Sequence, residues 1–188
     1  MQNRTHGVSN FKLGVCVVFF KPMATKMVST FQGSAMRSGL ALVAWLALSF
    51  GAASMGGFFL PGEWYADLHK PAWNPPNWIF APVWSALYIM MAISAWLIWK
   101  RGGFAGQRVA LTLFLLQLVF NAFWSPLFFG MRNPVLGLVD IALLWLALLG
   151  TTVAFWKARP LAGALLVPYV AWVTFAGVLN FTLWRLNP

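Results

Sequence analysis

The sequence contains few residues of the kinds that carry most enzyme chemistry. Cys16 is its single cysteine, so no disulfide can form within the chain. With His6 and His69 as the only histidines, a classical zinc site or a haem-ligating site is not expected, and we assign no metal ligands. The apolar segments hold no carboxylate pair and no Ser/His or Cys/His set. We therefore expect no conventional catalytic residues.

Charge is also scarce. Charged residues make up 9% of the 188 positions and hydrophobic residues 61%, whereas a soluble domain of this size carries about a quarter charged residues. The net charge of +10 comes from 13 Lys and Arg against 3 acidic residues. The basic residues lie mostly in short gaps between apolar runs, where they set membrane topology, so we do not expect nucleic-acid binding.

Five apolar stretches are each long enough to cross a bilayer, which takes roughly 20 apolar residues. None contains Lys, Arg or Glu, and Asp140 is the only ionisable carboxyl group within them. Backbone groups in lipid must pair within their own segment, and short links make successive helices antiparallel neighbours. The predicted fold is an all-α membrane protein, a five-transmembrane-helix bundle with spans at about 39–60, 78–99, 109–129, 134–156 and 161–184.

Residues 1–35 differ from the rest. Their apolar run LGVCVVFF (13–20) is too short to span a membrane and lacks a clear cleavage site, so we expect an N-terminal extension that is disordered or arises from a wrongly chosen start. Met23, Met27 or Met36 would be the alternative starts. We expect the five-helix transmembrane domain to occupy residues 36–188.

The basic residues predict the orientation. They concentrate in the 100–108 and 157–160 links, whereas the opposite side has fewer. The positive-inside rule then places the N-terminus in the cytoplasm and the 61–77 loop outside. We expect a multi-pass protein of a bacterial cell membrane.

The stretch KPAWNPPNWIFAPVW (70–84) lies between the first two spans. Its prolines fix φ and disfavour helix before Pro76, so the loop is expected to be ordered rather than floppy, with one exposed helical turn at Glu63–Asp67. Its tryptophans fit an interfacial aromatic belt. The loop has more aromatic residues than are needed to anchor the ends of two spans at the membrane surface. The alternative interpretation of the loop is a lid over a cavity.

Polar and aromatic side chains recur at helical spacing in the spans below that loop. Buried polar groups in a membrane must face one another or a ligand. Gln117, Asn121 and Asn180 could instead join helices, Asp140 could pair with a helix end, a Trp N–H or Arg132, and the small residues of the first helix (Ala52, Ala53, Gly56, Gly57) would serve packing. The convergence favours a pocket for a flat, apolar ligand. The candidate ligand-binding residues are Trp64, Tyr65, Trp84, Tyr88, Gln117, Asn121, Trp124, Tyr169, Trp172, Ala176 and Asn180.

Four segments carry a resemblance to a known family. WYADLHKPAWNPPNWIFAPVWSALY (64–88), LQLVFNAFWSPLFFG (116–130), LVD (138–140) and VPYVAWVTFAGVLNFTLWRLN (167–187) resemble the TspO/MBR family of tryptophan-rich sensory and translocator proteins. The resemblance implies a five-helix bundle, commonly a homodimer, with a pocket closed by the first loop. It implies no required cofactor, and as ligands tetrapyrroles such as protoporphyrin IX and haem, or drug-like apolar molecules of the benzodiazepine type.

The resemblance also assigns residues. Family pocket positions match Trp84, Asn121, Trp124, Trp172 and Ala176, with loop residues Trp64 and Tyr65 nearby. The resemblance implies a receptor or regulator that binds porphyrin, with transport of the porphyrin as a further role. The alternatives are a light-dependent porphyrin-degrading protein, with Trp84 and Trp172 as photochemical residues, and a small secondary transporter. Phe181 stands where the family's proposed cholesterol motif needs tyrosine, so sterol transport is not expected.

Overall fold

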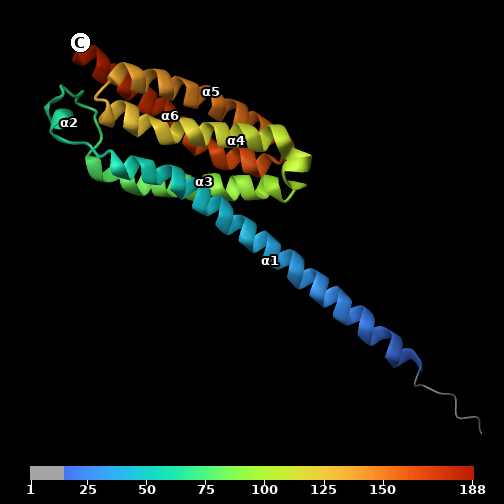
Figure 1. Cartoon of the computed structure of the whole chain (residues 1–188). Helices are drawn as coiled ribbons and strands as arrows, with labels where there is room; N and C mark the ends of the chain where they lie inside the picture. Colours follow the sequence, from blue (N-terminus) through green and yellow to red (C-terminus); the bar gives the residue numbers. More distant parts are fainter. Residues whose placement is uncertain (1–14) are drawn as a thin grey trace, which may run out of the picture. The chain divides into compact units, whose positions relative to one another are not determined.

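The computed structural model describes the backbone of residues 15–188 and the side chains from residue 35 onward. The chain divides into two compact units, Met1–Gly39 and Leu40–Pro188, and the candidate site lies in the second. The elements of the chain are helical throughout the described residues (Figure 1). In chain order they are α1 (Val15–Phe58), α2 (Glu63–Asp67), the 3₁₀ turn η1 (Asn77–Ile79), α3 (Phe80–Trp99), α4 (Gly103–Ser125), the π-helical turn η2 (Pro126–Gly130), α5 (Pro134–Ala158) and α6 (Pro160–Leu186).

Five of these segments are long and apolar enough to cross a membrane, which confirms the predicted five-helix membrane fold. They are Ala35–Phe58, Asn77–Trp99, Gly103–Gly130, Pro134–Ala158 and Pro160–Leu186. The exposed helical turn expected in the first loop is α2, at Glu63–Asp67.

The N-terminal prediction falls partly outside the described residues, since residues 1–14 are not among them. From Val15 the backbone is helical and runs without a break into the first span. The boundary expected at residue 36 is therefore not marked by a change in secondary structure. Whether residues 1–35 are an extension with a wrongly chosen start stays a prediction.

The link expected at 100–108 contains a short helical segment in the structure, because α4 begins at Gly103 and is kinked at Gln107. Gly102 (φ 112°) and Gly103 (φ 59°) make the reversal in the left-handed region that glycine tolerates, and α4 begins at once. The first turn of α4 is irregular at Gln107 (φ −133°, ψ 37°), close to the predicted start of the span. Arg101 reaches across this end of the bundle and donates a 2.6 Å hydrogen bond to the carbonyl of Ala158 at the end of α5.

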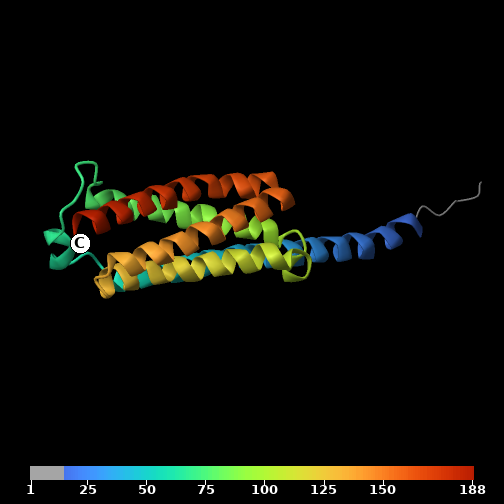
Figure 2. The same cartoon turned by 90° about the horizontal axis from the view of Figure 1, so that it is seen from above.

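The helices α3 to α6 pack as a bundle in which α5 lies against α4 and α6, and α3 lies against α6 and α4 (Figures 1 and 2). Gly137 makes the close approach of α5 possible, because a Cβ there would lie 2.8 Å from Phe128. The start of α5 is well specified: Pro134 occupies the first helical position, and Asn133 Oδ1 accepts the amides of Val135 and Leu136, both at 3.0 Å.

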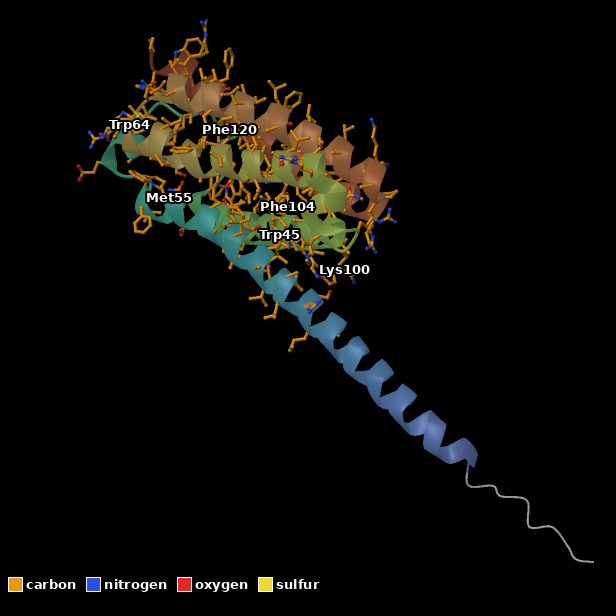
Figure 3. All side chains as sticks on the ribbon, turned by 45° about the vertical axis from the view of Figure 1, so that its right-hand side comes forward. Trp45, Met55, Trp64, Lys100, Phe104 and Phe120 are labelled. Atoms are coloured by element: carbon orange, nitrogen blue, oxygen red, sulfur yellow. The ribbon has the colours of Figure 1, made fainter. Side chains whose placement is uncertain are left out.

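The end of the bundle beside the basic 100–108 link is solidly packed with aromatic rings. Phe114 and Phe155 are fully buried and stack with ring centroids 5.8 Å apart. Trp45 of α1 meets Phe114 edge-on at 5.5 Å and Trp99 at 6.1 Å. Figure 3 shows Trp45 and Phe104 in this region, with Lys100 at its edge and Trp64 at the opposite end.

Candidate functional site

The first loop, between α1 and η1, is built as an ordered lid. Phe59 enters it against Gly130, where a Cβ would lie only 2.7 Å from the Phe59 ring, so a side chain at 130 would displace that ring. Tyr65 then packs edge-on against Phe129 at 5.3 Å, and Trp64 against Phe128 at 5.8 Å. These contacts fix the loop over the ends of the helices.

Hydrogen bonds within the loop add to its order. Asn74 N–H donates to the carbonyl of Pro71 at 2.9 Å, and the Tyr65 hydroxyl lies 3.4 Å from Asn74 Oδ1. Burial raises the pKa of the Tyr65 phenol, against a smaller lowering by the Asn74 hydrogen bond, so the hydroxyl is a donor at neutral pH. Lys70 Nζ donates to the carbonyls of Ala66 and Leu68 at 2.8 and 3.2 Å and thereby caps α2.

The lid rests on the π-helical turn η2. Pro126 has no amide hydrogen, so α4 cannot continue its regular bonding there, and Met131 N–H donates back to the carbonyl of Pro126 at 2.8 Å. The wider turn presents Phe128 and Phe129 side by side, with ring centroids 4.9 Å apart, and Phe128 stacks on Trp124 at 5.0 Å. The proline therefore shapes the floor on which the lid sits.

Beneath the lid lies a cavity of about 640 Å³, within the range of roughly 300–1,000 Å³ that small-molecule sites occupy. None of the described residues that line it is charged. The walls come from α1, the first loop, α3, α4, η2, α5 and α6. The principal lining side chains are Phe50, Ala52, Ala53, Gly56, Tyr65, Phe80, Trp84, Tyr88, Asn121, Trp124, Phe128, Ile141, Trp172, Ala176 and Asn180.

A chain of hydrogen bonds runs from the cavity wall into the bundle. The Tyr88 hydroxyl donates to Asn121 Oδ1 at 2.6 Å, and Asn121 Nδ2 donates to the Tyr169 hydroxyl at 2.8 Å. The Tyr169 hydroxyl in turn donates to Gln117 Oε1 at 3.1 Å. Trp84 covers this chain, stacked on Tyr88 at 5.5 Å and edge-on to Tyr169 at 6.0 Å. These polar residues thus join α3, α4 and α6 and fix the indole that faces the cavity.

A second polar link holds the opposite wall. Trp124 Nε1 donates to Asn180 Oδ1 at 3.2 Å, and Asn180 Nδ2 donates to the carbonyl of Pro134 at 2.8 Å. Both the oxygen and the nitrogen of the Asn180 side chain therefore make hydrogen bonds within the protein. Asn121 and Asn180 thus connect neighbouring helices, as the alternative interpretation of these amides expected. Both residues also border the cavity.

Trp172 is the exception among the buried polar groups of the cavity wall. Its indole Nε1 is buried and has no hydrogen-bond partner among the described residues. Phe80 and Phe175 hold the ring from two sides, edge-on at 5.8 Å and tilted at 5.4 Å. A buried N–H without an acceptor costs free energy, of order 1–3 kcal/mol, unless a ligand supplies the acceptor.

Asp140 stands apart from the cavity. It is buried in α5 and does not line the pocket, and its Oδ2 has no hydrogen-bond partner among the described residues. The indole N–H groups of Trp124 and Trp145 donate to Asn180 and Thr174 instead. The expected pairing of Asp140 with a tryptophan N–H is therefore not made through Oδ2.

Of the eleven predicted site residues, eight border the cavity and three do not. Trp64 lies on the lid against Phe128, Tyr169 lies behind Trp84, and Gln117 lies one hydrogen bond further from the cavity. Helical spacing placed Gln117 and Tyr169 on the face of the cavity, whereas Trp64 was expected as a residue of the loop. Spacing could not show that the Trp84 ring stands in front of Tyr169, or that Gln117 lies behind Tyr169.

Other lining residues were missed by the sequence reasoning. Ala52, Ala53, Gly56 and Gly57 of α1, which we expected to serve packing, border the cavity. A Cβ at Gly57 would meet nothing within 4 Å, so this glycine leaves space rather than permitting contact. Phe80 could have been found from its spacing, since it lies four residues before Trp84 on the same helical face.

The fold and the site define a class: a multi-pass membrane protein whose helices enclose an uncharged, tryptophan-lined pocket beneath an ordered loop. Comparison with known proteins identifies the family. A sequence profile of the TspO/MBR family matches residues 39–185, and the chain belongs to this family. It is therefore a membrane protein of a receptor and sensory family.

Individual relatives agree with this assignment. The chain is 45% identical over 154 residues to the tryptophan-rich protein TspO of Chlorobaculum tepidum, covering 79% of this chain and 96% of the relative. It is 45% identical over 141 residues to protein CrtK of Rhodobacter capsulatus, covering 73% and 86%. It is also 45% identical over 138 residues to the human translocator protein, covering 71% and 82%.

Proposed function

We propose that this protein is a membrane receptor that binds tetrapyrroles, such as protoporphyrin IX and haem, and similar flat apolar molecules in the cavity under the first loop. Binding would serve sensing or regulation of the porphyrin, or its movement across the membrane. The observation that carries the proposal is an uncharged aromatic cavity bordered by the indoles of Trp84, Trp124 and Trp172, with the Trp172 N–H lacking an acceptor among the described residues.

The chemistry of the walls favours a conjugated ring. Indoles of Trp84, Trp124 and Trp172 border the cavity from α3, α4 and α6 and offer flat, polarizable faces. A sugar or nucleotide would leave many polar groups unpaired against such walls. No histidine is among the described lining residues, so the ring would be held by stacking and hydrogen bonding rather than through an iron ligand.

The acceptor for Trp172 would be a carboxylate or carbonyl oxygen of the ligand. Asn121 is a weaker anchor than the sequence suggested, because its oxygen already accepts from Tyr88 and its nitrogen donates to Tyr169. Trp124 is likewise committed to Asn180. Trp84 and Trp172 are thus the two wall indoles whose N–H groups make no hydrogen bond among the described residues, and we assign the polar contact to Trp172, whose N–H is buried without an acceptor.

The test is a titration of protoporphyrin IX with the purified protein in nanodiscs, followed by porphyrin fluorescence in the dark. Trp172→Phe keeps a flat ring and removes the donor, so we expect binding to weaken about tenfold, equivalent to 1.4 kcal/mol. Trp156→Phe is the matched control, because this ring lies 48% exposed near the other end of the bundle and should leave the affinity unchanged. Absence of saturable binding by the wild-type protein would refute the proposal.

Light-dependent porphyrin degradation is a second candidate, favoured by the position of both Trp84 and Trp172 in the wall. Indoles stacked on a photoexcited ring can exchange electrons with it. We expect illumination of the porphyrin complex to give products by absorption spectroscopy, and the double variant Trp84→Phe/Trp172→Phe to give none. Product formation that survives in the double variant, at matched occupancy, would exclude the tryptophan mechanism.

We also propose the cellular arrangement expected from the sequence, with the basic links in the cytoplasm of a bacterial cell and the lid outside. Single cysteines at Trp73 and Arg101, in a Cys16→Ser background, should react with an impermeant maleimide on opposite sides of the membrane. The homodimer stays a prediction, and the molecular mass in nanodiscs would test it.

A further inference from the structure

The first loop is joined to the far end of the chain by a two-bond clasp. The backbone N–H of His69 donates to Asn187 Oδ1 at 2.9 Å, and Asn187 Nδ2 donates to the carbonyl of His69 at 3.0 Å. Asn187 directly follows α6, and 118 residues separate the two partners. Both views of the bundle place the loop carrying α2 and the C-terminus at the same end (Figures 1 and 2).

The carboxamide suits this task because it offers a donor and an acceptor side by side, as a neighbouring β-strand would. A third bond, from Asn187 Nδ2 to the carbonyl of Leu183 at 2.8 Å, fixes the amide on the last turn of α6. The Asn187 amide is thus held in its orientation by its own helix, independently of the loop. An aspartate would keep only the acceptor, and a leucine would keep neither.

Beyond His69 the loop reaches the wall of the cavity. Trp73 packs edge-on against Phe175 at 5.9 Å, and Phe175 touches Trp172 at 5.4 Å. Trp73 remains 47% exposed, so this contact is partial. The hydrogen bonds at His69 therefore hold the part of the loop that carries Trp73 against Phe175, which in turn contacts Trp172.

We infer that Asn187 is a positioning residue that keeps the lid closed and thereby sets how fast a ligand enters and leaves the cavity. The inference rests on the proposed function, because it assigns a gate to the proposed site. Asn187 does not line the cavity, so it touches no ligand. Because Asn187 touches no ligand, loosening the clasp should raise the association and dissociation rates together while leaving the dissociation constant nearly unchanged.

The exposed position of the clasp fits a gate. His69 lies in solvent contact and Asn187 is half-buried, so water can replace both bonds when the loop lifts. The clasp uses only the backbone of His69. The chain therefore offers a matched control, since His69→Ala removes a side chain at the same place and leaves both bonds intact.

The experiment is stopped-flow mixing of protoporphyrin IX with the full-length protein in nanodiscs, with dissociation measured by dilution into empty nanodiscs. For Asn187→Leu we expect both rate constants to rise about tenfold, because the substitution removes the two modest hydrogen bonds that hold the loop. In Asn187→Asp, which keeps the acceptor for the His69 amide, both rate constants should rise less. The rate constants of His69→Ala should match those of the wild type. Unchanged rates in Asn187→Leu would overturn the gate. So would a rise in dissociation alone with weaker affinity, which would mean that Asn187 stabilises the bound state.

Hydrogen exchange without ligand separates this inference from the proposed function. Asn187→Leu should speed exchange of the amides of residues 64–74 while the exchange of α3 to α6 stays unchanged. If the wild-type protein binds no porphyrin, the proposed function fails and the exchange result alone decides whether the clasp holds the loop. If porphyrin binds but the loop exchanges no faster in the variant, the clasp is overturned and the binding proposal stands.

Discussion

The two ends of the bundle use similar residues to opposite effect. At the basic end, aromatic rings fill the interior: Phe114 and Phe155 stack with no exposed surface. At the lid end, Trp84 and Trp172 border a cavity of about 640 Å³. Both ends are apolar and aromatic, so composition alone does not separate a packed core from a binding site.

Glycines permit close contact at both ends, at Gly137 beside the lid as well as at Gly163, and the difference is that some small residues at the lid end border the cavity. Gly163 at the basic end lets α6 touch Trp156, since a Cβ there would lie 2.7 Å from the Trp156 backbone, whereas Gly57 at the lid end faces open space. The side-chain amides of Asn121 and Asn180 border the cavity, and their hydrogen bonds hold the surrounding aromatic rings in place. In this protein the cavity therefore lies where hydrogen-bonded polar side chains hold aromatic rings in place and small residues leave space between the helices.

The largest effect is expected from breaking the packed end. Phe114→Ala removes a fully buried ring from its stack with Phe155 and should lower the free energy of unfolding by about 3 kcal/mol or more, because the cavity cannot collapse fully. The measurement is thermal unfolding in detergent, followed by tryptophan fluorescence. Val109→Ala, on the same helix but 72% exposed, is the control and should change little. Equal losses in the two variants would contradict the comparison.

A smaller effect is expected from the hydrogen-bond chain beside the cavity. Asn121→Leu deprives the buried Tyr88 hydroxyl of its acceptor and should cost about 1–3 kcal/mol of stability. Tyr88→Phe in the same chain removes the stranded donor, so the double variant should recover part of the loss. A double-mutant cycle on unfolding measures the coupling. Strict additivity of the two substitutions would mean that the bond does not brace the cavity wall.

The sequence predicted the fold well because its determinants are local. Span length, the absence of charge and the obligation to pair backbone groups in lipid fix five helices without tertiary information. The third span was expected to begin at 109, just after the kink at Gln107, and the structure adds a short helical segment before that kink, from Gly103. Proline similarly indicated an ordered loop, and the structure has one.

The site was only partly predictable, because helical spacing gives a face but not a depth. Spacing put Tyr169 and Gln117 on the same face as the cavity, yet Trp84 stands in front of Tyr169 and both lie behind the wall. The clasp between His69 and Asn187 joins residues 118 positions apart through a backbone group, which no sequence pattern marks. Likewise, the sequence cannot distinguish a small residue that permits contact from one that leaves space.

That distinction gives the prediction with the smallest effect on stability, in which the lid end is made to resemble the basic end. Ala53→Leu adds a side chain that points into the cavity from α1, where it fills space rather than displacing packed atoms. We expect unfolding to change by no more than about 0.5 kcal/mol, since overpacking costs arise only where the interior is already full. Porphyrin affinity should nevertheless fall about tenfold, because the ligand and the new side chain compete for one volume. The equivalent substitution at Gly163, against Trp156, should be strongly destabilising. If Ala53→Leu proved as destabilising as the Gly163 change, the space under the lid would be part of the packed core, and the contrast between the two ends would fail.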